Sequence, residues 1–134
     1  MDSETSETMS RVSHAAAIGG VSGTFDNYQR ESQQTAIYPH QGRNLLYPVL
    51  GLLSEAGEIA DRMKRVIRDE GGDVSATRRS ELKAELGDVL WYLSQVATEL
   101  ELSLQEIAEG NLLKLAERQQ RGTLRHHGAD QLAV

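Results

Sequence analysis

Cysteine is absent from this chain of 134 residues, and aromatic residues make up only 4% of it. Without cysteine there are neither disulfide bonds nor thiolate ligands for a metal. The scarcity of aromatic residues means that any core consists mainly of aliphatic side chains. No apolar run approaches the roughly 18 residues of a membrane-spanning helix. The first ten residues include Asp2, Glu4 and Glu7 and lack the basic segment of a signal peptide, so we expect a cytoplasmic protein.

Basic residues are also in the minority, which gives a net charge of −6 and a pI near 5.2. That balance argues against a nucleic-acid partner and against an anionic membrane surface, because both attract basic patches. It leaves room for a small phosphorylated ligand that is bound together with metal ions. The length of the chain suggests one small domain.

Hydrophobic spacing predicts four helices and no convincing strand. We expect them at about residues 25–36, from between 44 and 48 to 68, at 76–100, and from 103 to a stop at Gly122. Thr24 is a candidate N-cap, and Ser103-Leu-Gln-Glu106 has the pattern of a capping box. The composition of residues 1–22 and 123–134 predicts flexible tails on either side of one helical domain, residues 23–122. The predicted fold is all-α, with a Gly71-Gly72 turn that makes the second and third helices an antiparallel hairpin.

Two acidic pairs of equal spacing, Glu55-Ala-Gly-Glu58 and Glu85-Leu-Gly-Asp88, lie on the two helices of this hairpin. At about 100° per residue, both pairs fall on the same-handed flank of their apolar stripe. Their distances from the turn differ by roughly 3 Å, so the four carboxylates should converge. Carboxylates at one level repel each other unless a cation lies between them. Gly57 and Gly87 lie inside the pairs, where the close approach of a neighbouring helix or a ligand would explain them.

Four convergent carboxylates predict a site for Mg²⁺, with Mn²⁺ as a substitute, because hard oxygen ligands favour these ions over zinc. A di-iron site is disfavoured, since it needs Glu-x-x-His pairs. Mg²⁺ usually keeps part of its coordination shell for phosphate oxygens and water, which points to phosphoryl chemistry. The alternative is that the acidic residues are merely solvated and the chain is a helical interaction module.

A group of polar residues, Asn111, Lys114 and Arg118, follows helical spacing near the apolar side of the fourth predicted helix. Such side chains could bind the phosphate groups that the metal does not neutralise. Snorkelling at the edge of a bundle is the alternative. A second basic cluster, Lys64, Arg65 and Arg68, is expected to face solvent or to pair with Glu58 and Asp61 at helical spacing, although Lys64 could reach a phosphate.

Together these residues resemble the MazG-like family of all-α nucleoside triphosphate pyrophosphohydrolases. The family signature is ExxE, a gap, and ExxD; here the gap is residues 59–84, and the segment from Asn111 to Arg118 also matches. The resemblance covers about residues 24–122. It implies that water attacks the α-phosphorus of a (d)NTP to give (d)NMP and pyrophosphate. It implies that Glu55, Glu58, Glu85 and Asp88 are the catalytic metal ligands, and that Lys114 and Arg118 hold the leaving pyrophosphate.

One departure from the family pattern concerns Ser54, because many relatives have an additional acid at that position. Serine cannot serve as the base there, so the general base is left open between metal-activated solvent and one of the four carboxylates. The same departure supports a second hypothesis, a non-catalytic nucleotide- or alarmone-binding regulator on the same scaffold.

The loop His40-Gln41-Gly42-Arg43-Asn44-Leu45 resembles the HQPRNL-type segment of dCTP-preferring relatives. His40 or Gln41 could therefore contact a base. Tyr92 could stack on the base or the sugar, although packing is the simpler role for an aromatic residue.

A homodimer or homotetramer is expected, because a four-helix chain of this size has a thin core and active sites of this family commonly form in oligomers. Met63, Val66 and Trp91 are the candidate interface residues.

Overall fold

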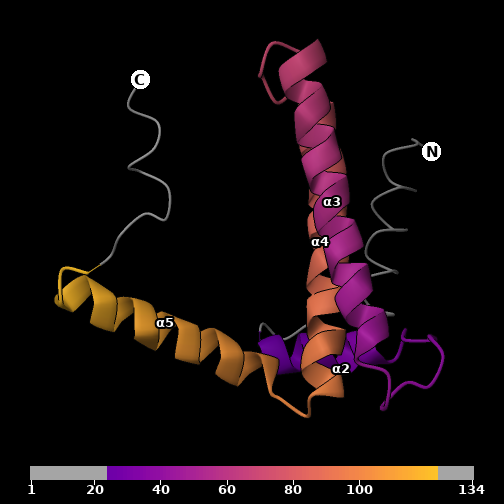
Figure 1. Ribbon diagram of the computed structural model, residues 1–134, viewed down its shortest axis with the longest axis vertical. Helices are drawn as coiled ribbons and strands as arrows, with labels where there is room; N and C mark the ends of the chain where they lie inside the picture. Colours follow the sequence, from indigo (N-terminus) through magenta and orange to yellow (C-terminus); the bar gives the residue numbers. More distant parts are fainter. Residues whose placement is uncertain (1–23, 124–134) are drawn as a thin grey trace, which may run out of the picture.

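Four helices make up most of the part of the chain, residues 24–123, that the computed structural model describes (Figure 1). They are α2 (Phe25–Gln33), α3 (Leu46–Asp69), α4 (Ala76–Glu99) and α5 (Leu104–Gln120), and the described residues contain no strand. The all-α prediction is confirmed. The predicted tails, residues 1–22 and 123–134, lie outside the described residues except for Thr123. Within residues 24–123, no helix is both long enough and apolar enough to cross a membrane.

Helices α3 and α4 form a long antiparallel hairpin, as the spacing of the sequence predicted (Figure 1). The chain reverses at Gly71 and Gly72, whose φ angles of 67° and 90° are rarely accessible to residues with a side chain. The Gly72 N–H donates to the Val66 carbonyl over 3.0 Å, which closes the end of α3. Ser75 then caps α4, because its hydroxyl accepts the Arg78 N–H at 3.2 Å.

Helix α2 begins at the predicted cap, where Thr24 Oγ1 accepts the Asn27 N–H at 3.2 Å. It ends at Gln33, three residues before the predicted end at Ala36. The reason is local: the Thr35 hydroxyl and the Thr35 N–H both donate to the Ser32 carbonyl, at 2.7 and 3.1 Å. These hydrogen bonds stabilise a turn at Ser32–Thr35 in place of a further turn of α-helix.

Helix α5 projects away from the hairpin, and its main contact is with α2 (Figure 1). Polar groups fix its first turn on α2: Gln29 accepts the Leu104 N–H at 2.8 Å, and Asp26 accepts the Ser103 hydroxyl at 2.7 Å. Ser103 also caps α5 by accepting the Glu106 N–H, as the capping-box pattern predicted. Gly122, with φ 63°, ends the helix at the predicted stop.

Few apolar side chains are buried within the described chain. The buried hydrophobic residues are Ala36, Tyr38, Val66, Ala97 and Leu104. Val66 is fully buried in the hairpin, so the prediction that it lies at a subunit interface is wrong. Trp91 also packs within the chain, where its Nε1 donates to Thr35 Oγ1 over 2.8 Å.

The tightest glycine contact is at Gly51 on α3. A Cβ placed there would overlap the ring of Tyr92 on α4, whereas a Cβ at Gly57 or Gly87 would meet nothing within 4 Å. Within residues 24–123, therefore, no helix closely approaches the two glycines of the acidic pairs. Close helix packing occurs on the N-terminal side of Gly57, where Gly51 accommodates the Tyr92 ring.

Substitution of Gly51 by alanine should destabilise the protein by about 1–3 kcal/mol, because the added methyl group displaces the Tyr92 ring. Gly57→Ala is the matched control on the same helix. Alanine there has open space and a better helix propensity, so stability should be unchanged or rise by up to about 1 kcal/mol. Urea unfolding followed by circular dichroism measures both changes, and equal effects of the two substitutions would contradict the proposed Gly51–Tyr92 contact.

Candidate active site

Three carboxylates from the two helices of the hairpin meet on one side of it. Glu55 comes from α3, and Glu85 and Asp88 come from α4; each offers an oxygen, and these oxygens lie within 4.8 Å of one another. Glu85 is the most enclosed, with 9% of its surface exposed, while Glu55 is half-buried and Asp88 is exposed. The hairpin geometry thus places acids from segments about 30 residues apart at one level.

Glu58, the fourth predicted ligand, lies outside this group. It is exposed, about one turn after Glu55 on α3. It is nevertheless close enough that its charge contributes to a raised pKa of Glu55. The structure therefore brings three of the four predicted carboxylates together and leaves Glu58 at the rim.

The cluster is acidic, and Arg62, which contacts Glu85, offsets only part of its negative charge. Burial raises the pKa of Glu55, and the charges of Asp88, Glu85 and Glu58 and a hydrogen bond with Glu85 raise it further. The pKa values of two nearby tyrosines are raised as well. Burial and then the Asp88 charge raise the pKa of Tyr28 on α2, and burial, Tyr47, Glu55 and Asp88 raise that of Tyr92. Sequence reasoning missed Tyr28, because nothing in its local pattern places α2 against the hairpin.

The residues of the cluster fit a hard divalent cation. All three side chains offer oxygen atoms, and the neighbouring acidic charges add to the effect of burial in raising the pKa of Glu55, so a bound cation would relieve their repulsion. Oxygen-only donor sets are those that Mg²⁺ and Mn²⁺ prefer. Glu55, Glu85 and Asp88 could therefore hold such an ion, with Glu58 as a further carboxylate at the edge.

Arg62 of α3 contacts this cluster from the side of the turn. Its Nε and Nη2 both donate to Glu85 Oε1, the former over 2.9 Å, and its Nη1 donates to Glu81 Oε2 over 3.3 Å. Sequence reasoning did not single out Arg62. The signal was present, because Arg62 follows Glu58 by four residues and Glu55 by seven, which places all three on one face of α3.

The predicted base-contacting loop lies at the start of α3, roughly 14 Å along the helix from Glu55. Glu99, at the end of α4, holds this loop: it accepts the Tyr38 hydroxyl at 2.6 Å and the N–H groups of Gly42 and Asn44 at 2.8 and 2.9 Å. Burial alone would raise the pKa of Glu99, but these three hydrogen bonds outweigh it and lower the pKa.

His40 and Gln41 are exposed at the tip of this loop, and His40 has a φ of 56°. Two tyrosines lie between the loop and the carboxylates. The Tyr47 ring stacks on Tyr38, with centroids 5.0 Å apart, and Tyr92 is close enough to Tyr47, Glu55 and Asp88 for each to raise its pKa.

The predicted phosphate-binding residues lie elsewhere in the chain. Asn111, Lys114 and Arg118 are exposed on α5, which projects from the hairpin, so a single chain does not bring them to the carboxylates (Figure 1). Lys64 pairs with Asp61 at 2.6 Å and lies about half a turn around α3 from Glu55.

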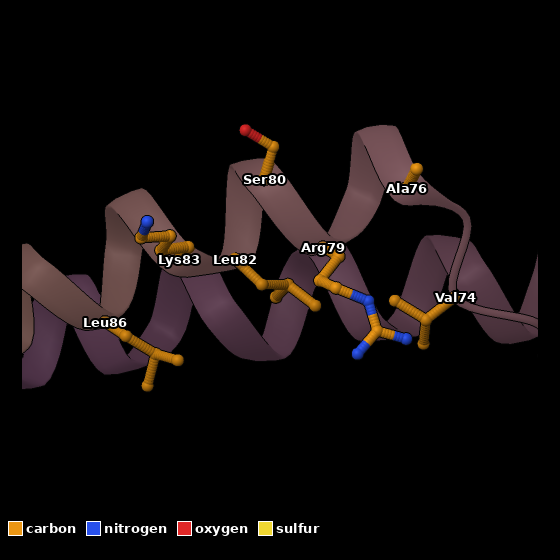
Figure 2. Close-up of a pocket in the computed structure, with 7 residues that line it drawn as sticks. All are labelled: Val74, Ala76, Arg79, Ser80, Leu82, Lys83 and Leu86. Carbon is orange, nitrogen blue, oxygen red and sulfur yellow. The ribbon is translucent and has the colours of Figure 1, made fainter.

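A hollow of about 640 Å³ lies near the turn of the hairpin and does not include the carboxylates. Figure 2 shows Val74, Leu82 and Leu86 along one side of it, with Arg79 between them. Leu86 is largely exposed there. This hollow is an apolar surface next to the site and separate from it.

Comparison with known proteins bears on these features. The family model described as MazG nucleotide pyrophosphohydrolase domain matches residues 44–123. The chain belongs to the MazG family. It is also 42% identical over 108 residues to the Gene 37 protein of Mycobacterium phage L5, a match that covers 77% of this chain and 95% of that protein. No solved structure matches the chain.

The MazG match spans α3, α4 and α5, and it includes both acidic pairs, Arg62 and the polar residues of α5. It begins at Asn44. Helix α2, with Tyr28, and the loop tip at His40 and Gln41 therefore precede the matched segment.

Replacement of Glu55 by glutamine should stabilise the metal-free protein at neutral pH. Glu55 has an ordinary pKa of 4.5, and the folded protein raises it, so the folded state holds this proton more tightly than the unfolded state does. Stability is therefore lost as the pH rises from below 4.5 through the folded pKa. The gain in Tm of E55Q over wild type should be largest near about pH 8 and should fade near about pH 4.

Thermal unfolding in EDTA at several pH values measures this effect. Glu109→Gln, on the exposed surface of α5, is the control and should not alter the pH dependence. A Tm difference between E55Q and wild type that stays constant with pH would contradict the charge repulsion at Glu55.

Proposed function

We propose that this MazG-family chain is a nucleoside triphosphate pyrophosphohydrolase that uses Mg²⁺, or Mn²⁺ in its place, to convert a (d)NTP and water into a (d)NMP and pyrophosphate. The observation that carries the proposal is the three-carboxylate cluster of Glu55, Glu85 and Asp88 on the hairpin, inside the MazG match. Its oxygen donors suit the ion that usually accompanies a triphosphate.

In this proposal, Glu55, Glu85 and Asp88 hold the divalent cation, and Glu58 adds a carboxylate from the rim. When bound, the ion supplies charge neutralisation and polarisation of the phosphoryl oxygens. The α-phosphate then lies against the cluster, where the side chains orient the triphosphate for attack by water. Ser54 is exposed and is no base at neutral pH, so the proton of the attacking water passes to a carboxylate or to solvent.

We propose that the nucleoside lies along Tyr92 and Tyr47 toward His40 and Gln41. Tyr92 supports this orientation, because it is close to the carboxylates and also to Tyr47. The ring of Tyr92 offers a stacking surface for sugar or base. Glu99 keeps the loop at the far end in place through its three hydrogen bonds.

We further propose that the working form is a homodimer or homotetramer. Leu112 and Leu113 on α5 are 66% and 67% exposed, and Leu53 on α3 and Leu86 on α4 also face solvent in a single chain. Exposed apolar side chains on several helices favour association. In such an assembly, Asn111, Lys114 and Arg118 of one subunit would reach the triphosphate of another, since they do not reach the carboxylates of their own chain.

A non-catalytic nucleotide-binding regulator is the second candidate. The observation in its favour is Ser54, which stands where many relatives carry an additional acid. Such a protein would be stabilised by a nucleotide and would not hydrolyse it.

A panel of NTPs and dNTPs, assayed with Mg²⁺ and with Mn²⁺, should yield pyrophosphate from at least one nucleotide. Asp88→Asn should lower kcat/KM by more than about 100-fold, because even residues that only support metal ligands contribute 10–100-fold. A coupled assay of pyrophosphate release measures both the activity on the nucleotide panel and the effect of D88N. Asp73→Asn, an exposed acid in the turn, is the matched control and should retain activity.

Two outcomes would contradict the proposal. If no nucleotide yields pyrophosphate while one of them raises the Tm, the regulator is the correct function. If D88N retains wild-type turnover, the carboxylate cluster is not the catalytic site.

Sedimentation equilibrium should give a mass of two or four times the 14.8 kDa of one chain. Leu113→Glu should shift that mass toward the single chain while circular dichroism retains the helical signal, because a charge replaces an apolar contact. Gln119→Glu, an exposed polar position on the same helix, is the control. A monomeric wild-type protein with full activity would contradict the proposed oligomer.

A further inference from the structure

Five charged residues of alternating sign form a continuous row along the hairpin from its turn to the carboxylate cluster. In order they are Glu70, Arg78, Glu81, Arg62 and Glu85. Arg78 Nε contacts Glu70 Oε1 at 2.6 Å, Arg78 Nη1 contacts Glu81 Oε2 at 2.7 Å, and Arg62 Nη1 contacts the same oxygen at 3.3 Å. The Glu70–Arg78, Glu81–Arg62 and Arg62–Glu85 steps join the two arms of the hairpin, and the Arg78–Glu81 step lies within α4, so each member between the two ends has a partner on both sides.

Arg62 is the last cation of this row, and it contacts the most enclosed acid of the cluster. Two of its nitrogens donate to one oxygen of Glu85, Oε1, which leaves Oε2 for a different partner. The Glu85 side chain is 12% exposed and that of Arg62 is 28% exposed. Water therefore screens this pair less than a surface pair.

Without that contact, Glu85 would be a largely buried carboxylate beside the charges of Glu55 and Asp88, with its hydrogen bond to Glu55 as the remaining favourable contact in the cluster. A rotation of its side chain away from them would relieve the repulsion and would remove one oxygen from the site. The Arg62 guanidinium opposes this rotation, because its Nε and Nη2 both donate hydrogen bonds to Glu85 Oε1, and rotation would break them. Glu81 in turn fixes Arg62, since Arg62 Nη1 donates to it.

We propose that Arg62 is a positioning residue for the metal ligand Glu85. It holds Oε1, keeps the side chain in the orientation that presents Oε2 to the cluster, and remains in contact when the cation binds. The inference rests on the proposed metal site. Residues that hydrogen-bond to a metal ligand typically contribute 10–100-fold to metal affinity.

Arg78 provides a matched control. Arg78 and Arg62 contact the same Glu81 oxygen, and their side chains are similarly exposed, 25% and 28%. They differ in their second partner, which is Glu70 for Arg78 and Glu85 for Arg62. Removal of either arginine cuts the charged row and one ion pair to Glu81. Only removal of Arg62 releases Glu85.

The experiment is a calorimetric titration of the full chain with Mn²⁺, without nucleotide, for wild type, Arg62→Gln, Arg62→Lys and Arg78→Gln. R62Q should bind Mn²⁺ about 10–100-fold more weakly than wild type. R62K should lie between them, because an ammonium group can donate to Glu85 but lacks the fork of the guanidinium. R78Q should stay within about twofold of wild type while its Tm falls as much as that of R62Q.

The possible results distinguish a failure of the proposed metal site from a failure of the role proposed for Arg62. If wild type does not bind Mn²⁺, the proposed site and this inference both fail. If wild type binds and R62Q binds equally or more tightly, the site stands and the inference is overturned, since Arg62 would then only compete with the ion. Equal weakening in R78Q would also overturn it. If R62Q does not fold, R62K decides: weaker binding supports the inference, and wild-type binding overturns it.

Discussion

Repulsion among Glu55, Glu85 and Asp88 is the constraint on which the rest of this structure depends. Burial raises the pKa of Glu55, and the charges of Asp88 and Glu85 raise it further, so the fold must hold these carboxylates against their own charge. It does so with two long helices packed along their length and with Arg62 at one side of Glu85. Tyr28 and Tyr92 lie close enough to Asp88 for its charge to add to the effect of burial in raising the pKa of both phenols.

The turn of the hairpin sets the level at which the acids meet. A slip of one residue would rotate one helix by about 100° and shift it by about 1.5 Å, which would move a carboxylate from the cluster to another face. Gly71 and Gly72 fix the reversal of the chain, and the row from Glu70 to Glu85 fixes the register beyond it. The packing of the Tyr92 ring against Gly51 also fixes the register of the two helices, at a level farther from the turn than the cluster. The site thus lies between two independent register contacts.

Much of this architecture could be predicted from local sequence. Caps at Thr24 and Ser103 and the glycines at the turn act over a few residues, so pattern alone located most helix ends, and wheel positions brought Glu55, Glu85 and Asp88 together. The rest depends on side chains that are distant in sequence. The position of Glu58, the Arg62–Glu85 contact and the fit of Tyr92 on Gly51 depend on side-chain orientation across the hairpin. The direction of α5 depends on contacts such as Leu104 with Gln29, 75 residues apart.

The distribution of polar and apolar groups in a single chain is unusual for a helical domain, and it is the basis of the proposed oligomer. Polar groups are buried between α2 and α4: the hydroxyls of Ser32 and Ser94 lie 2.9 Å apart, and Gln95 Oε1 is buried without a hydrogen-bond partner among residues 24–123. On α5, Leu104 is buried in the first turn, but Leu112, Leu113 and Leu115 are exposed. Hydrophobic burial is normally the main favourable term in folding, and in a single chain these large apolar side chains remain outside the core. The oligomer proposed above would bury them and would bring the basic residues of α5 to another subunit's carboxylates, so one interaction would complete both the core and the proposed phosphate site.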